Sequence, residues 1–224
     1  MGGIVQQQHI LERYRHLRTI GIRHHSAALD CVARAAILER AKHFGLTYGR
    51  ILVADSAEEM TLIFDLAIHT AKPGRSRAID RYARAVALSS GSDEAQTLTA
   101  ICGAQFSVWR IERRHEVAGV MVKDMLRDRE TWLVDEALTV SAPSGLTFAS
   151  RLYWPAEFAM TCGVVVPIDA ELMDDVLIEG TAWTRCADPE QFADDPRFAT
   201  AVYRTALNSG IMDCVVFQEP SGLS

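Results

Sequence analysis

The sequence predicts an α+β protein with an N-terminal helical lobe, a five-stranded antiparallel small β-barrel and C-terminal helices. Two patterns predict this arrangement. Apolar residues recur at helical spacing over the first hundred residues, whereas β-branched and aromatic runs begin near Gln105. Helical spacing returns towards the end of the chain. We therefore expect a helical lobe over residues 1–104, and a small β-barrel with C-terminal helices over residues 105–224.

Apolar spacing and capping residues predict five helices in the first lobe. Ser56 is followed three residues later by Glu59, a capping box that satisfies backbone N–H groups in the first turn. Pro73 and Gly74 end that helix, because proline has no N–H to continue the helical hydrogen bonds. The five helices are expected over about residues 4–19, 26–44, 56–70 and 76–86, with a shorter one from residue 92.

The second part of the chain is expected to form a meander that curls into a barrel. Five runs carry the strand pattern: FSVWRIERR, VAGVMVKDML, ETWLVDEALTV, GLTFASRLYW and EFAMTCGVVVPI. Two later segments show helical spacing, AELMDDVLIEGTAW and PEQFADDPRFATAVYRTALNSG. A last strand is expected in IMDCVVF.

Part of this β-region resembles a known module. The segment WRIERRHEVAGVMVKDMLRDRETWLVDEALT, continuing to RLYW and CGVVVPI, is similar to the small β-module of SEC-C type bacterial proteins. The whole chain resembles uncharacterised bacterial proteins with a helical lobe followed by a β-region. The cysteine-rich zinc tail of the SEC-C type is missing, since only Cys214 lies near the end. The resemblance implies a fold and no activity.

Composition excludes several classes of protein. The chain has a net charge of −6 and 49% hydrophobic residues, without an apolar run long enough to span a membrane or a secretion signal. We therefore expect a cytoplasmic globular protein with no membrane partner. Five scattered cysteines without a C-x-x-C pair are typical of buried free thiols. The phosphate-loop, G-x-G-x-x-G and G-x-S-x-G motifs are also missing, which excludes the classical nucleotide-binding and nucleophile-elbow signatures.

Positive charge is concentrated in the first part of the chain. Residues 1–84 hold 13 Lys and Arg against 8 Asp and Glu, whereas residues 85–224 hold 10 against 21. The basic residues crowd around the turn between the third and fourth helices. There, free N–H groups of a helix capped by Ser76 and nearby guanidinium groups would bind an anion. The predicted anion site comprises Lys72, Arg75, Ser76, Arg77, Arg81 and Arg84. Local pairing, for example with Asp80, is the structural alternative.

A second candidate site would hold a divalent transition metal. Asp65 and His69 lie four residues apart on one helical face, so a carboxylate and an imidazole would point the same way. The adjacent His24 and His25, expected just before the second helix, would supply the remaining ligands. In this alternative the protein is a metal-dependent hydrolase.

These patterns lead to three expectations for function. The first is a non-catalytic cytoplasmic binding or adaptor protein that needs no cofactor and recognises a phosphate, a nucleic acid or an acidic protein partner through the basic turn. The second is the metal-dependent hydrolase. The third is a structural homo-oligomer, in which the basic and acidic parts of different copies attract each other.

Overall fold

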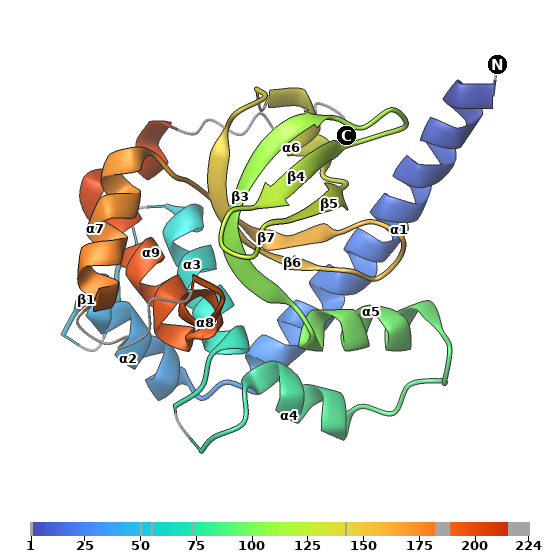
Figure 1. The fold of residues 1–224 in the computed structure, drawn as a ribbon. Coiled ribbons are helices and arrows are strands. Elements are labelled where there is room, and N and C mark those ends of the chain that lie inside the picture. The colour runs from blue at the N-terminus through green and yellow to red at the C-terminus, as the bar shows by residue number, and fades with distance from the viewer. Residues whose placement is uncertain are drawn as a thin grey trace.

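The computed structural model describes residues 2–49, 51–54, 56–72, 74–141, 143–181 and 189–214. Its centre is a curled antiparallel sheet, with the long helix α1 passing behind it and the C-terminal helices gathered at one side (Figure 1). The α-helices are α1 (Gly2–Asp30), α2 (Arg34–His43), α3 (Ala57–His69), α4 (Ala78–Ala85), α5 (Asp93–Cys102), α6 (Glu136–Ser141), α7 (Ala170–Thr181), α8 (Pro189–Asp194) and α9 (Pro196–Ser209). A 3-10 turn, η1, spans Ile211–Cys214.

The five-stranded sheet has the order β5-β4-β3-β6-β7, and all neighbouring strands are antiparallel. Its strands are β3 (Gln105–Arg114), β4 (Val120–Asp124), β5 (Arg129–Leu133), β6 (Thr147–Tyr153) and β7 (Met160–Pro167). The two short strands β1 (Thr47–Tyr48) and β2 (Ile51–Leu52) pair with each other.

The expected barrel and meander were wrong in two respects. The sheet is open: among the described residues, its edges meet only at an isolated bridge between Leu133 and Ala159. The second half of the run ETWLVDEALTV forms α6 instead of a longer strand. Because α6 interrupts the strand, the chain crosses over and β6 pairs with β3 rather than with β5. The α+β class and the five antiparallel strands are confirmed.

Alternate side chains of β3 enter two different parts of the core. Phe106 and Val108 pack with apolar residues of α3, α7 and α9. Trp109 and Ile111 face the other way and pack inside the curl of the sheet. This period of two is the one expected for a strand that is buried on both faces. One face of the sheet therefore packs against α3, from the N-terminal part of the chain, together with α7 and α9 from the C-terminal part.

The first helix is longer than predicted. It continues through the expected break before Ser26 as far as Asp30. Ile20 and Ala28 continue the buried stripe at helical spacing, and no proline interrupts the helix. Gly21 lies within this helix at a point where α1 approaches the sheet closely and leaves no room for a side chain. A Cβ atom added at Gly21 would lie 2.7 Å from the Tyr153 hydroxyl oxygen.

Two of the predicted helix starts are confirmed, and two were wrong. Ser26 lies within α1, and the second helix, α2, begins only at Arg34. Ser56 accepts a hydrogen bond from the Glu59 N–H at 3.2 Å, and Ser92 caps α5 in the same way. Ser76, however, is not the cap of α4. That helix begins at Ala78, with Arg77 in the capping position and without a side-chain cap.

The C-terminal helices also differ from the prediction in detail. The segment beginning PEQFADD divides into α8 and α9, because Asp195 caps α9 and Pro196 starts it. Residues 211–214 of the last expected strand form η1, and residues 215–217 lie outside the described part of the chain. Within the described residues, no helix combines the length and apolar character needed to cross a membrane.

Candidate metal centre

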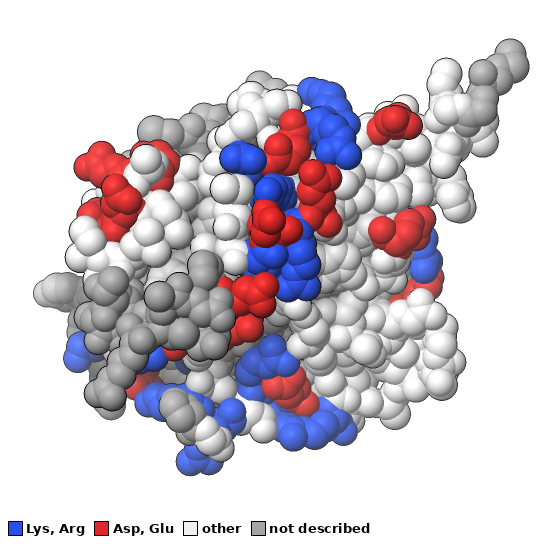
Figure 2. All heavy atoms as spheres, viewed as in Figure 1, with Lys and Arg blue, Asp and Glu red and all other residues white. Residues whose placement is uncertain are grey.

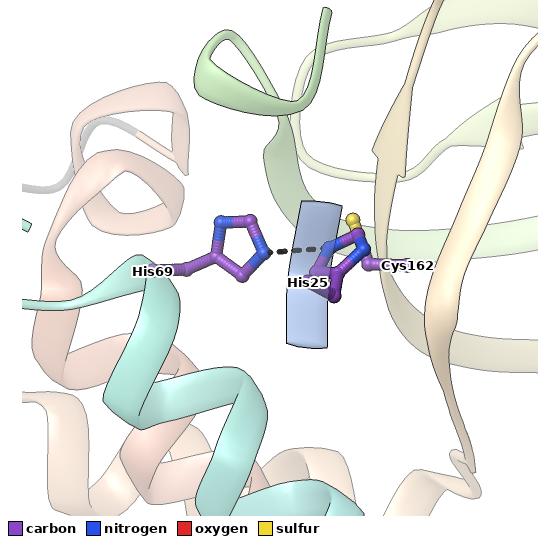
Figure 3. A group of neighbouring side chains, drawn as sticks. All are labelled: His25, His69 and Cys162. Carbon is purple, nitrogen blue, oxygen red and sulfur yellow. Dashed lines mark hydrogen bonds between the residues drawn. The ribbon is translucent and has the colours of Figure 1, made fainter. Parts of the chain in front are cut away.

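Three potential metal ligands converge from three separate elements. His25 lies on α1, His69 is the last residue of α3, and Cys162 lies on β7. The Nε2 atoms of the two histidines are 3.2 Å apart, and the ligand atoms of all three residues lie within 4.8 Å of one another. Figure 3 shows the His69 ring facing the His25 ring, with Cys162 on the same side of His69 as His25.

The packing of α1 brings His25 into this cluster. Gly21 lets the helix lie against Tyr153, and His25 follows one turn later on the same side of the helix. The His25 ring then contacts the ring of Tyr153 edge-on and lies 5.4 Å from the ring of His69, measured between centroids. A side chain at position 21 would require either α1 or the Tyr153 ring to shift.

A backbone hydrogen bond determines the tautomer of His25. Its Nδ1 lies 2.8 Å from the carbonyl oxygen of Gly21, and a carbonyl can only accept, so Nδ1 carries the proton. The lone pair therefore lies on Nε2, which faces His69. In metal proteins, this same bond from the other ring nitrogen orients a ligating histidine.

Burial keeps both histidines neutral. It lowers the pKa of His25, and it lowers the pKa of His69 well below its usual range, with the nearby positive charge of Arg151 adding to the effect. Only neutral imidazole has a lone pair to give to a metal. Without an ion, the Nε2–H of His69 donates to Nε2 of His25 across the 3.2 Å contact.

The third ligand, Cys162, is the one that the sequence analysis missed. Burial raises the pKa of its thiol, so the free group is protonated at neutral pH. A bound transition metal would displace that proton, because coordination deprotonates thiols. No motif of closely spaced residues marks this cysteine as a ligand, because four strands of the sheet lie between His69 and Cys162 in the sequence.

A cavity of about 330 Å³ borders two of the three ligands, His25 and Cys162. Apolar side chains from α1 and α3 line much of it, together with Arg18, which donates to the carbonyl oxygen of Thr161 at 2.8 Å. A small ligand in this cavity would approach an ion from the side of His25 and Cys162.

Asp65 was predicted as a metal ligand, but its carboxylate is already engaged. Both of its oxygens accept hydrogen bonds from the Arg151 guanidinium, at 3.0 and 3.1 Å, and Tyr203 donates a third at 3.0 Å. Arg151 and Asp65 side chains are only 7% and 3% exposed. The carboxylate therefore neutralises a buried guanidinium and is not available to a metal.

His24 was also predicted as a ligand, and it points elsewhere. Its Nε2 donates to the carbonyl oxygen of Glu94, and its Nδ1 accepts from the Tyr82 hydroxyl, both at 3.0 Å. Both ring nitrogens are thus satisfied, which leaves no lone pair for an ion. Successive residues point about 100° apart around a helix, so His24 and His25 face different neighbours.

The predicted basic site is divided among several partners. Arg77 pairs with Asp80 and also donates to the carbonyl oxygen of Cys102. Lys72 pairs with Glu39 at 2.8 Å. These contacts fit the local pairing that the sequence analysis left open.

The remaining basic residues of the predicted site have different surroundings and do not form one group. Arg81 donates to the carbonyl oxygens of Ser76 and Cys31. Arg75 and Arg84 are exposed, and of these two only Arg75 lines a cavity among those described, next to Lys72 and Arg77. Figure 2 shows basic groups beside acidic ones over α4, and the same mixture over β3 to β5.

The comparisons with known proteins give one family. The model of a family of unknown function, DUF7986, matches residues 8–199, a range that includes all three potential ligands. No curated protein and no solved structure matches the chain. The resemblance to SEC-C type modules rests on the sequence motif alone.

Proposed function

We propose that this chain, which belongs to the DUF7986 family, is a metal-binding protein that holds a transition-metal ion such as Zn²⁺ through His25, His69 and Cys162. The observation that carries the proposal is the convergence of three ligand atoms from α1, α3 and β7 within 4.8 Å. Two imidazoles and a thiolate are a ligand set that zinc accepts.

The distances in the cluster support an ion of this size. With Zn–N bonds of about 2.0–2.1 Å, two nitrogens of a tetrahedral site lie about 3.3 Å apart. The two Nε2 atoms are separated by 3.2 Å. The same geometry requires about 3.6 Å between a nitrogen and the sulfur. The three ligand atoms lie within 4.8 Å of one another, so the contacts to the sulfur would have to shorten by no more than about 1.2 Å.

Three protein ligands leave one coordination position for an exogenous ligand, and the cavity beside His25 and Cys162 gives it room. Metal-bound water in such a position supports hydrolysis when a free carboxylate or imidazole can act as a base. Asp65 is the acidic residue in the described lining of this cavity, and Arg151 and Tyr203 hold it. This favours metal-linked binding over the hydrolase alternative.

The test is metal affinity, measured by competition with a chromophoric chelator and by elemental analysis of protein purified without added metal. We expect one Zn²⁺ per chain. Loss of a metal's outer-shell partner costs about 10- to 100-fold in affinity, so removal of a ligand in Cys162→Ala should cost at least about 100-fold.

Cys102→Ala is the matched control. Cys102 is also a half-buried free thiol, but it lies outside the cluster. With Co²⁺ as a spectroscopic substitute, the thiolate-to-metal absorption should disappear in the Cys162 variant and persist in the Cys102 variant. Wild-type protein without measurable affinity for Zn²⁺ or Co²⁺, or equal losses in both variants, would overturn the proposed function.

A further inference from the structure

A second cavity lies beside His69, distinct from the cavity that borders His25 and Cys162. It has a volume of about 390 Å³ and is formed by the end of α3, described residues of the segment between α3 and α4, the start of β3 and the α8–α9 junction. This volume is in the range of small-molecule sites. Its lining contains five cationic side chains and two acidic ones: Lys72, Arg75, Arg77, Arg127 and Arg151, with Asp194 and Asp195.

Most of these cations are neutralised by the protein itself. Arg151 is held by Asp65 and Arg77 by Asp80. Arg127 pairs with Asp124, a contact in which both side chains are 3% exposed. These three guanidinium groups shape the wall of the cavity but have little charge to offer a ligand.

Lys72 and Arg75, between α3 and α4, supply the available charge. Arg75 is exposed, and within the described residues no side-chain hydrogen bond or ion pair engages it. Lys72 contacts Glu39 in a pair whose side chains are 75% and 51% exposed, and such surface pairs contribute only about 0–1 kcal/mol. Lys72 can therefore turn towards an anion at little cost.

His69 provides an independent indication of a missing ligand. The residue is 4% exposed, and its Nδ1 atom has no hydrogen-bond partner among the described residues. His69 lines this cavity, and Nδ1 is on the side of the ring away from His25 (Figure 3). A buried polar atom without a partner is costly, so native proteins usually satisfy it.

Metal binding would change what Nδ1 can do. In the metal-free pair, His69 carries its proton on Nε2 and donates it to His25, so Nδ1 is an acceptor. When Nε2 ligates an ion, the proton of the neutral ring must be on Nδ1, which becomes a donor. Ligating histidines usually donate this N–H to a carboxylate, a carbonyl or a water.

We infer that the cavity binds a small phosphate-bearing molecule, whose oxyanion accepts hydrogen bonds from Arg75, Lys72 and the Nδ1–H of metal-bound His69. This inference rests on the proposed metal site and adds a ligand class to it. The cavity exceeds the size of a lone phosphate, which favours a small organic phosphate. Because one imidazole touches both ligands, metal and anion should strengthen each other's binding, and by linkage the two factors must be equal.

The experiment measures anion affinity by calorimetry with the metal-free and the Zn²⁺-loaded full chain. The probes are inorganic phosphate and sulfate, and chloride at equal ionic strength is the reference. The Zn²⁺ concentration is kept in the micromolar range. We expect sulfate and phosphate to bind at least about 5-fold more tightly to the loaded protein, the lower end of common allosteric coupling. Nitrogen NMR of His69 should show the proton on Nδ1 in the loaded state.

Two arginine variants separate a site from a general charge effect. Arg75→Ala should abolish the anion response and leave the intrinsic Zn²⁺ affinity unchanged. Arg84→Ala removes a nearby cation on α4 that is also exposed but does not line the cavity, so this variant should retain the response.

The outcomes distinguish this inference from the proposed function. If Zn²⁺ binds but anions have the same affinity with and without it, or Arg75→Ala behaves like Arg84→Ala, an anion is not the partner of His69. The inference then fails while the metal site stands. If Zn²⁺ does not bind at all, the proposed function fails, and the coupled anion site fails with it.

Discussion

Replacing Asp65 with Asn should destabilise the protein strongly, because it leaves the Arg151 guanidinium buried without a counter-ion. The carboxylate accepts two hydrogen bonds from Arg151 and one from Tyr203, and the Asp65 and Arg151 side chains are 3% and 7% exposed. Removing one partner of such a pair costs about 3–5 kcal/mol. For a total stability of about 5–15 kcal/mol, this is a large fraction.

The assay is urea denaturation followed by circular dichroism, with a control on an exposed pair. Glu136→Gln breaks the contact between Arg15 and Glu136, in which the arginine is 61% exposed. We expect that variant to lose about 1 kcal/mol or less. Combining Asp65→Asn with Arg151→Met should recover part of the lost stability, because it removes the uncompensated charge.

Two results would refute this reasoning. One is an Asp65→Asn variant as stable as Glu136→Gln, and the other is a double variant no more stable than Asp65→Asn alone. Metal affinity provides a further check. Under conditions where Asp65→Asn remains folded, it should lose much less Zn²⁺ affinity than Cys162→Ala, since the carboxylate is not a ligand in our proposal.

Three further predictions concern local features. Ser56→Ala removes the cap of α3 and should lower the free energy of unfolding by about 1 kcal/mol in denaturant titrations. Gly119→Ala should lower the melting temperature, because Gly119 has a φ of 75° and an added Cβ would lie 2.2 Å from the Leu133 carbonyl oxygen. The Arg13 hydrogen bond lowers the pKa of Asp93 from 3.8 to about 2. This contribution to stability is present above pH 4 and is lost as the pH falls towards 2, so Asp93→Asn should flatten acid unfolding in that window.

Matched controls accompany these changes. Ser90→Ala replaces an exposed serine outside the helices and should leave stability unchanged, unlike the cap variant. Gly45→Ala shares the positive φ of Gly119 but meets nothing within 4 Å, so a melting temperature equal to that of Gly119→Ala would contradict the steric argument. For Asp93, an acid transition identical in wild type and Asp93→Asn would show that this carboxylate does not govern it.

Local chemistry in the sequence was sufficient for much of the fold. The Ser56 cap, the strand periodicity from Gln105 and the segment of α3 all correspond to elements of the structure. Each depends on neighbours within a few residues, which is the range over which capping and side-chain spacing act. The open sheet was not predictable in this way, because strand order depends on where the chain returns after α6.

The candidate metal site was likewise predictable only in part from the sequence. The sequence by itself identified His25 and His69 as potential ligands, from their residue types and their expected helices. Only the tertiary structure shows that His24 contacts Tyr82, that Asp65 pairs with Arg151, and that Cys162 lies beside the two imidazoles. The physical reason is that a ligand set is defined by distances between side chains on α1, α3 and β7, and packing, rather than sequence separation, determines those distances.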